Sequence, residues 1–328
     1  MPTAEELSKR IFQNEFQFEE TALDVFRYQF EGNEVYRQYV QLLGIQPESI
    51  TTVADIPFLP IRFFKTHKII TGNQYPEITF TSSGTSGQTV SRHFVTDVSL
   101  YEKSFIKGFE KFYGSAEEWC ILALLPSYLE REGSSLVYMC EHLIKKSKHP
   151  LSGFYLHNYD NLYSVLEQLE SEKQKTLLLG VSYALLDLAE QFPLVLQHTI
   201  IMETGGMKGK RREMTKAALH NRLKNAFNVD VIHSEYGMTE MLSQAYSLGN
   251  GIYSCPPWLR LIVRDSYDPF TLVDNEITGG INVIDLANVN SCSFIATQDM
   301  GKVFDDGTFE IIGRFDDAEI RGCNLMIE

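Results

Sequence analysis

The hydrophobic pattern of the first fifty residues has the period of α-helices. Thr3 and Glu6 form a capping box in front of the first amphipathic segment. A second apolar face follows, and Gly32 is placed to end that helix. A third helix is expected to end at Gly44. Residues 51–68 contain two prolines, which predict an extended connection.

From Ile69 onward, strand and helix patterns alternate. Near-continuous apolar runs at 120–125 and 176–181 are typical of strands that are covered on both faces. This alternation predicts right-handed βαβ units and a largely parallel sheet flanked by helices. Strands are predicted at 77–80, 90–96, 119–125, 175–180, 198–203, 229–233 and 278–285, and helices at 98–112, 134–146, 160–173, 181–191 and 211–226.

The last seventy residues have a different pattern. Short apolar runs alternate with Gly and Asp turns there, as in residues 304–309, which predicts a small antiparallel unit. We therefore expect an α/β protein with an N-terminal helical region at 1–68 and a large domain at 69–328. Within that domain, residues 257–328 would form a β-rich subdomain.

Composition and charge narrow the class of protein. The 328 residues have a mean hydropathy of −0.15, which is ordinary for a globular chain. The formal net charge of −14 predicts repulsion from phosphodiester backbones, so nucleic acid is not an expected partner. No apolar run is long enough to span a bilayer, and the acidic N-terminus is unlike a secretory signal. Five cysteines without close pairing indicate a reducing compartment, and we expect the cytoplasm.

One loop combines glycines with hydroxyl side chains. It follows the strand predicted at 77–80, and its glycines allow backbone N–H groups to converge on an anion. A bound phosphate would suit such a loop, although the Walker A ending is absent and a mobile turn is an open alternative. The candidate nucleotide-binding residues are Ser82, Ser83, Gly84, Thr85, Ser86 and Gly87.

Two later segments contain motifs that favour the phosphate-binding interpretation of this loop. One is Tyr236-Gly237-Met238-Thr239-Glu240, and the other contains Asp299-Met300-Gly301 and Gly313-Arg314-Phe315-Asp316-Asp317. In this order, the three motifs resemble those of the adenylate-forming enzymes, the acyl-CoA synthetases and their relatives. The resemblance implies the N-terminal-domain architecture of that superfamily, with ATP and Mg²⁺ as cofactors.

The resemblance also implies roles for the residues of the Tyr-Gly-x-Thr-Glu motif. Tyr236 and Gly237 would lie against the adenine, and Thr239 would touch the α-phosphate. Glu240 would be the metal ligand, because magnesium is commonly held by one carboxylate together with phosphate oxygens. The alternative is that Tyr236 is a core aromatic residue and that Glu240 is a solvated helix residue.

Four further residues match positions of the same family. Asp299 would accept hydrogen bonds from the ribose hydroxyls, and Arg314 would reach the ribose and phosphates. Arg314 could instead form a salt bridge with one of the aspartates that follow it. Gly205 and Gly206 follow a predicted strand where relatives place backbone against the adenine, but a plain turn at the end of a strand is an equal alternative.

Three longer stretches of sequence indicate one branch of the superfamily. Residues 56–67, 125–131 and 203–209 resemble LuxE-type acyl-protein synthetases. That resemblance implies activation of a fatty acid with ATP, acyl transfer to a cysteine of the enzyme, and delivery to an acyl reductase or acyl carrier. Cys323 is the expected acceptor, since it lies beside Arg321 near the C-terminus, whereas Cys120 and Cys140 lie in apolar core patterns.

The position of the last residue favours the same branch. The sequence ends at Glu328, just past the Gly-Arg-x-Asp-Asp motif, so we expect the mobile C-terminal domain of acyl-CoA synthetases to be absent. Its lysine would be missing too, and the basic residues Lys65, His67 and Lys68 are expected to have a surface role. Two alternatives remain open, a short acyl-CoA or acyl-AMP ligase of the phenylacetate type and a non-catalytic adenylate-binding subunit. An oligomer is possible.

Overall fold

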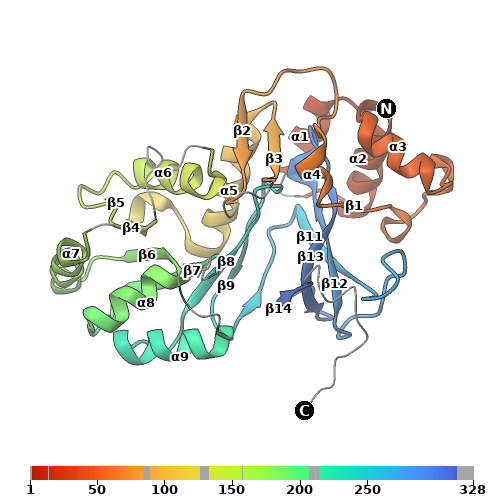
Figure 1. The fold of residues 1–328 in the computed structure, drawn as a ribbon. Helices are drawn as coiled ribbons and strands as arrows, with labels where there is room; N and C mark the ends of the chain where they lie inside the picture. Colours follow the sequence, from red (N-terminus) through yellow and green to blue (C-terminus); the bar gives the residue numbers. More distant parts are fainter. Residues whose placement is uncertain are drawn as a thin grey trace, which may run out of the picture.

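The computed structural model describes residues 2–13, 15–83, 89–125, 133–156, 158–206, 211 and 214–315. Two six-stranded sheets lie side by side, and a two-stranded hairpin lies at one end of the junction between them (Figure 1). The predicted α/β class is thereby confirmed, with one largely parallel sheet and one antiparallel sheet nearer the C-terminus.

The first large sheet has the strand order β5-β4-β6-β7-β8-β9, and all its pairings except β8 with β9 are parallel. Every residue of the two central apolar strands β4 and β6 is buried, as their sequences predict. The strands are β4 (Cys120–Leu124), β5 (Gly153–Phe154), β6 (Thr176–Val181), β7 (Thr199–Thr204), β8 (His233–Tyr236) and β9 (Ala245–Ser247).

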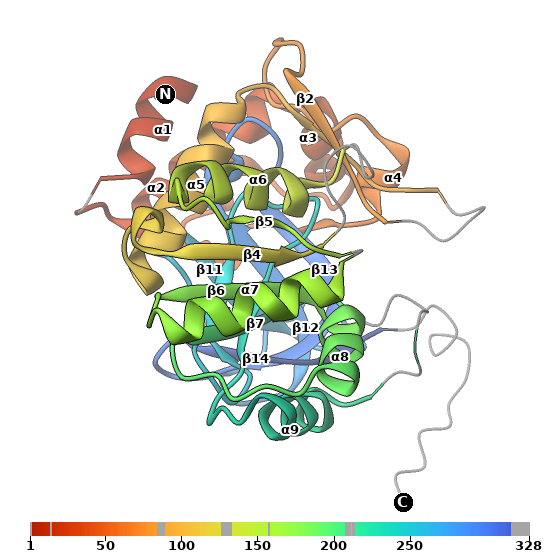
Figure 2. The same cartoon turned by 90° about the vertical axis from the view of Figure 1, so that its left-hand side faces the viewer.

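Among the described residues, five helices flank this sheet, in agreement with the βαβ prediction. Figure 2 shows α7 running across the side of the sheet that faces away from the second sheet. The helices are α5 (Val98–Tyr113), α6 (Ser135–Ser147), α7 (Tyr159–Ser171), α8 (Ser182–Gln191) and α9 (Lys216–Phe227). Within the described residues, none of the helices has the length and apolar character that a membrane crossing requires.

The second large sheet has the order β10-β14-β13-β12-β11, and these pairings are antiparallel. A sixth strand, β1 (Leu59–Pro60), comes from the N-terminal part of the chain and pairs with β13 in parallel. The others are β10 (Ile252–Tyr253), β11 (Leu259–Arg264), β12 (Gly279–Asp285), β13 (Phe294–Val303) and β14 (Phe309–Arg314), and the short helix η4 (Leu286–Asn288) follows β12.

The structure corrects three local predictions. The strands predicted at 77–80 and 90–96 exist as β2 (Ile78–Thr81) and β3 (Arg92–Val95), but they form an antiparallel hairpin outside the parallel sheet. The strand expected at 229–233 begins only at His233. The connection at 51–68 is not simply extended, because it contains η2 (Val53–Asp55), β1 and α4 (Phe63–Thr66).

The N-terminal helices pack against the antiparallel sheet. They are α1 (Ala4–Ile11), α2 (Phe18–Gly32) and α3 (Glu34–Leu42), followed by η1 (Pro47–Ser49), and η3 (Ala116–Glu118) lies further along. The predicted capping box of Thr3 and Glu6 is present at α1. The buried Gln29 side chain of α2 donates to the carbonyl oxygens of Asn288 and Val289, both at 3.0 Å, and accepts from Ser293 N–H at 2.9 Å. These bonds tie the first fifty residues to the segment between η4 and β13.

We predict opposite effects of alanine at two buried glycines. At Gly180, in β6, a Cβ would lie 2.7 Å from Leu185 Cγ and 3.1 Å from Leu124 Cβ, so Gly180→Ala should destabilise the fold by about 1–3 kcal/mol. At Gly108, inside α5, a Cβ meets nothing within 4 Å, so Gly108→Ala should stabilise by about 0.5–1 kcal/mol. Urea unfolding of both variants measures the two changes. Equal stability of the two variants would contradict the packing described for β6.

Candidate functional site

The predicted nucleotide-binding residues gather where the parallel strands end. Gly205 and Gly206 follow β7, and Tyr236 and Gly237 end or follow β8. These two strands are parallel neighbours with Thr204 opposite Glu235, so the two glycine-containing turns lie at the same edge of the sheet. The carboxyl ends of parallel strands are the common location of ligand sites in α/β proteins.

Tyr236 joins the two sheets at this edge. Its ring packs against Tyr253 and Phe309, with centroid distances of 5.9 and 5.5 Å, in a second hydrophobic cluster between the sheets. Its hydroxyl donates a hydrogen bond of 2.9 Å to Asp299 in β13. Tyr236 is therefore a core aromatic residue, as one of the two interpretations held, but its polar end faces a predicted site residue.

Asp299 and Arg314 lie opposite one another on β13 and β14. Arg314 Nε is 3.1 Å from Asp299 Oδ1, and the Arg314 side chain is 66% exposed. Burial raises the pKa of Asp299, whereas the positive charges of Arg314 and the buried Arg264 oppose that rise. The arginine thus pairs with Asp299, and the guanidinium is the exposed side of the pair.

Glu240 is connected to the glycine and hydroxyl loop. It is 6% exposed and lies in a turn, so the alternative of a solvated helix residue is wrong. The Ser91 hydroxyl hydrogen-bonds to the Glu240 carboxylate, and Ser91 N–H donates to Ser82 Oγ at 2.9 Å. Ser82 and Ser83 directly follow β2, the first strand of the hairpin, so the base of the predicted phosphate loop adjoins Glu240. Gly84, Thr85, Ser86 and Gly87 lie outside the described residues.

Two cations act on the Glu240 carboxylate from a distance. Burial raises the pKa of Glu240, while the hydrogen bond from Ser91 and the charges of Arg314 and Lys65 lower it. Lys65 belongs to α4, a short helix held in place by Ile61 N–H donating to Ala296 of β13 at 2.9 Å. A surface role was expected for Lys65, and its proximity to Glu240 was not foreseen.

Two buried side chains hold the main chain of Thr239 and Glu240. His93 Nδ1 is 2.8 Å from the Thr239 carbonyl oxygen, and Asn288 Nδ2 donates to the Glu240 carbonyl oxygen at 2.7 Å. Thr239 itself is partly exposed. The sequence offered no signal for this clamp, because its members lie about 50 to 150 residues from the loop that they hold.

Asp285 fixes the second half of the same loop. Its carboxylate accepts hydrogen bonds from the N–H groups of Leu242 and Ser243, at 2.7 and 3.0 Å, and from the Ser243 hydroxyl. A further bond comes from Ala287 N–H at 3.2 Å. Asp285 is fully buried, and burial raises its pKa to about 6 although these four donors favour the charged form.

A separate ion cluster supports the Gly205 turn. The buried Glu203 carboxylate lies 2.6 Å from Lys216 Nζ and 3.5 Å from His220 Nε2. Burial would raise the pKa of Glu203, but the hydrogen bond from His220 and the Lys216 charge lower it to about 2. Ser182 Oγ donates to the Gly205 carbonyl oxygen at 3.1 Å, and Gly205 has φ +66°. The turn is therefore built by structural contacts, and contact of Gly205 and Gly206 with adenine stays a prediction.

Packing against a neighbouring side chain explains why residue 237 is a glycine. A Cβ at this position would lie 2.5 Å from Glu235 Oε1, so only glycine leaves room for that buried carboxylate. Thr204 Oγ1 donates to the other oxygen of the same group.

The described cysteines are poor thiolates. Burial raises the pKa of Cys120 to about 11 and that of Cys292 to about 12, and it raises the pKa of Cys140 and Cys255 as well. The core positions predicted for Cys120 and Cys140 are confirmed, and Cys292 is fully buried as well. Cys323 lies outside the described residues.

The described part of the site contains no preformed metal cage. Among the described ranges, no group of three or more His, Cys, Asp or Glu side chains could hold a metal ion. One buried carboxylate whose pKa is raised by burial, Glu240, is the kind of ligand that Mg²⁺ uses together with phosphate oxygens. The residues therefore fit a magnesium ion that arrives with a phosphate ligand.

Comparison with known sequences identifies relatives of the N-terminal third. Residues 4–126 match the model of the family described as acyl-protein synthetase, LuxE. Over 66 residues, the chain is 39% identical to the long-chain-fatty-acid–luciferin-component ligase of Photorhabdus luminescens. This alignment covers 20% of this chain and 56% of that protein. The predicted resemblance to LuxE-type acyl-protein synthetases is thereby confirmed for residues 4–126.

Solved structures extend the likeness to the rest of the fold. A 2-hydroxyisobutyryl-CoA ligase in complex with 2-HIB-AMP and CoA has a TM-score of 0.65 at 15% identity, over 97% of this chain and 70% of that one. ATP-bound MatB from Rhodopseudomonas palustris has a TM-score of 0.53 at 15% identity, over 72% and 47%. The chain has the fold of adenylate-forming ligases, and it spans about half the length of the luciferin-component ligase and of MatB.

We predict that Asp285→Asn destabilises the protein by about 2–3 kcal/mol at pH 7.5, because an amide would turn one of its own donors toward the N–H groups of the loop. The Asp285 carboxyl group binds its proton more tightly in the folded chain than in the unfolded chain, whose aspartate pKa is about 4. Its contribution to stability is therefore present below about pH 4 and is lost as the pH rises through 6. The deficit of the variant should be larger at pH 5 than at pH 7.5.

Chemical unfolding at the two pH values measures this difference, with the exposed Asp274→Asn as the matched control. A deficit that is unchanged or smaller at pH 5 would show that burial does not raise the pKa of Asp285.

Proposed function

We propose that this protein is an ATP-dependent acyl-protein synthetase. It activates a carboxylic acid, a fatty acid by our inference, as an acyl-adenylate and transfers the acyl group to a cysteine. From there the acyl group passes to an acyl reductase or carrier partner. The observation that carries the proposal is the meeting of Tyr236, Asp299 and Arg314 with the Ser82–Ser91–Glu240 chain at the carboxyl edge of the parallel sheet.

Nucleotide recognition is assigned to Asp299 and its two partners, Tyr236 and Arg314. Two carboxylate oxygens, oriented by the Tyr236 hydroxyl and the Arg314 guanidinium, suit a pair of neighbouring ribose hydroxyls. The Arg314 side chain is 66% exposed, so its guanidinium can face a phosphate on the solvent side of this pair. ATP bound there would direct its phosphates toward Glu240 and the hydroxyl loop.

Adenylation is assigned to the Glu240 region. A carboxylate oxygen of the acid attacks the α-phosphorus, the bond from that phosphorus to the bridging oxygen breaks, and pyrophosphate leaves. Magnesium, when bound with ATP, would neutralise phosphate oxygens, and Glu240 is its proposed protein ligand. Lys65 and Arg314 lie close enough to act electrostatically on Glu240, so they are the described cations best placed to stabilise the developing charge.

Acyl transfer requires a thiolate outside the buried core. The thiolate would attack the acyl carbon, the bond to the AMP oxygen would break, and AMP would leave. The four described cysteines are unsuited to this step because burial raises the pKa of each thiol. We assign the acceptor role to Cys323.

The named relative supports a fatty acid as the substrate, because it is a long-chain-fatty-acid–luciferin-component ligase. The apolar space among Phe109, Met139, Leu177 and Met202 has a volume of only about 10 Å³, so core packing explains it and it does not identify an acyl site.

We predict distinct effects for the two site carboxylates on acid-dependent ATP–pyrophosphate exchange. Glu240→Gln should lower kcat by about 100-fold or more, because the charge next to the transferring phosphorus is lost. Asp299→Asn should raise the KM for ATP by about tenfold with a smaller effect on kcat. The exposed Glu48→Gln serves as the control. Exchange by Glu240→Gln at half of the wild-type rate or more would remove Glu240 from the chemistry.

The acceptor is tested by incubating the protein with MgATP and radiolabelled fatty acids of different chain lengths, followed by a denaturing gel. We expect a hydroxylamine-sensitive labelled band that Cys323→Ala loses and Cys255→Ala retains, since a thioester on Cys323 carries the label. Acid-dependent pyrophosphate release without a labelled band would mean that the adenylate passes to CoA or another carrier. Neither label nor pyrophosphate release would contradict the synthetase proposal.

A further inference from the structure

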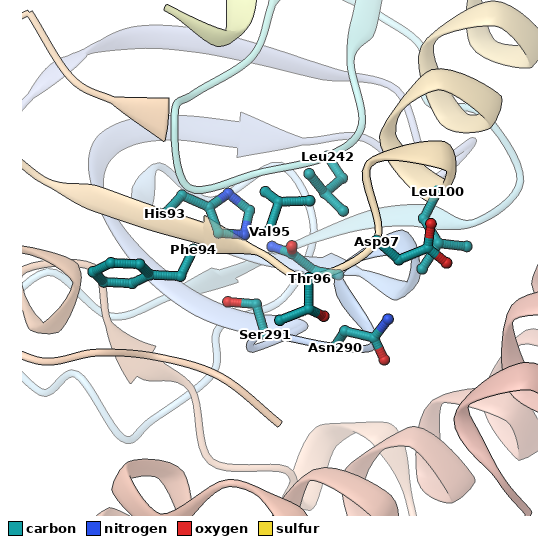
Figure 3. Close-up of a pocket in the computed structure, with 10 residues that line it drawn as sticks. His93, Phe94, Val95, Thr96, Asp97, Leu100, Leu242, Asn290 and Ser291 are labelled. Carbon is teal, nitrogen blue, oxygen red and sulfur yellow. The ribbon is translucent and has the colours of Figure 1, made fainter. Parts of the chain in front are cut away.

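The two carboxylates assigned to the site are positioned by different parts of the molecule. His93 holds the main chain next to Glu240, and it lines the small hollow shown in Figure 3. Asp299 is not among the residues around that hollow and lies instead in an irregular part of β13. Its position therefore depends on contacts within the antiparallel sheet.

β13 is bulged at Asp299. Gly280 of β12 is opposite Met300 of β13. Asn282, two residues further along β12, is opposite Ala296, so β13 contains extra residues between the two pairs, and Asp299 is one of them. A bulge interrupts the ladder of backbone hydrogen bonds and changes the direction in which a side chain points. Bonds from outside the ladder are needed to hold its backbone groups.

The buried guanidinium of Arg264 spans this bulge. Arg264 ends β11 and is 7% exposed, and its Nη1 donates to the Ile281 carbonyl oxygen of β12 at 2.7 Å. Its Nη2 donates to the carbonyl oxygen of Thr297 in β13. Thr297 Oγ1 donates to the Ile281 carbonyl oxygen at 2.8 Å and accepts from Asp299 N–H at 3.1 Å. Arg264 therefore joins the two strands where their ladder is interrupted, next to Asp299.

The neighbouring chain is shaped around this guanidinium. Gly280 lies opposite Arg264 in the pairing of β12 with β11, and a Cβ there would be 2.7 Å from Arg264 Cζ. The ring of Phe315, the residue after Arg314, has its centroid 5.8 Å from the same atom. Phe315 N–H also donates to the Gln298 carbonyl oxygen in the bulge at 2.8 Å. The bulge and Arg264 thus support both members of the Asp299–Arg314 pair.

The positive charge of Arg264 acts on Asp299. Within the described residues, the guanidinium contacts two carbonyl oxygens and one amide oxygen, which are all uncharged. Burial lowers the pKa of Arg264, and the negative charge of Asp299 opposes that change. Asp299 therefore has one positive charge inside the sheet, from Arg264, and one on the solvent side, from Arg314.

We propose that Arg264 is a positioning residue for nucleotide recognition, which holds the β13 bulge so that the Asp299 carboxylate faces Tyr236 and Arg314 and which favours the ionised form of that carboxylate. An ionised carboxylate accepts hydrogen bonds from ribose hydroxyls more strongly than a neutral one. Arg264 stays beside Asp299 when Arg314 faces a phosphate, because it is buried between the strands. The effect on the nucleotide rests on the proposed function, whereas the effect on Asp299 does not.

The groups around Asp299 fix the direction of the expected pH effect. In the described structure, Asp299 is faced by Tyr236 on β8, Arg314 on β14 and Arg264 on β11. Burial raises the pKa of Asp299, and these three groups oppose that rise. Tyr39 of α3 faces Arg264, but burial raises its pKa to about 12, so it is neutral and does not compensate the arginine. Loss of the Arg264 charge should therefore raise the pKa of Asp299 further, so that Asp299 becomes protonated at higher pH.

The first test follows the Asp299 carboxyl group and needs neither nucleotide nor activity. Carboxyl carbon shifts of aspartate-labelled protein give the midpoint of its titration, and Asp299→Asn assigns the signal. We expect this midpoint to move to higher pH in Arg264→Met. Arg260→Met removes a partly exposed charge from the same strand and should leave the midpoint unchanged. An unchanged midpoint in Arg264→Met, or an equal shift in both variants, would overturn the proposal.

ATP binding tests the consequence for the nucleotide. By calorimetry at neutral pH, we expect Arg264→Met to raise the Kd for ATP about tenfold and Arg260→Met to leave it unchanged. The deficit of Arg264→Met relative to the wild type should grow as the pH falls toward the Asp299 midpoint. Equal Kd values for the two variants would overturn the positioning role.

A conservative pair of variants covers the case in which Arg264→Met does not fold. Lysine keeps the charge but lacks the planar fork that reaches both carbonyl oxygens, so Arg264→Lys should keep the Asp299 midpoint and raise the Kd for ATP about threefold. Arg260→Lys should match the wild type, and equal Kd values for these two variants would contradict the role of the bulge. A wild-type protein that binds no ATP would refute the proposed function, while the titration of Asp299 would still decide the role of Arg264.

Discussion

The arrangement of this site depends on a single buried carboxylate. Asp285 ends a strand of the antiparallel sheet, yet it accepts hydrogen bonds from the loop that leaves the parallel sheet. Ser243, one of its partners, continues the contact to Ser104 in α5 and to the Trp258 indole, at 3.0 and 3.1 Å. These bonds are buried and join elements from both sheets, so they hold the loop that carries Thr239 and Glu240 against the sheet that contains Asp299.

Two buried carboxylates near the site, Glu203 and Glu240, differ in how their negative charge is compensated. Lys216 and His220 contact Glu203 directly, which keeps its pKa near 2, as is common in a structural ion cluster. Among the described residues, Glu240 has a hydrogen bond from Ser91 and the distant positive charges of Arg314 and Lys65, and burial still raises its pKa. A buried carboxylate at the edge of a sheet with incomplete compensation is typical of a ligand site, where the remaining charge comes with the ligand.

Much of the fold could be predicted because its signals are local. The apolar runs of β4 and β6 and the capping box at Thr3 need only a few neighbouring residues, and both are correct. The hairpin of β2 and β3 was assigned to the wrong sheet, since a short strand does not encode its partner. His93, Asn288 and Lys65 were missed at the site for a related reason. Each is an ordinary polar residue in its own segment and acquires its contact with the loop only through the tertiary fold.

The pairing of β1 with β13 bears on how such a chain can change in evolution. Within the first sixty residues, Gln29 hydrogen-bonds to Ser293 and β1 pairs with β13 at Ile295. Asn288, which lies just before Ser293 in the chain, hydrogen-bonds to the Glu240 carbonyl group. The segment that resembles LuxE is therefore not an exchangeable cassette. A chimera that received this segment from a distant relative would separate residues that contact one another in this fold, so the interface between the two parts would have to form again from unmatched residues.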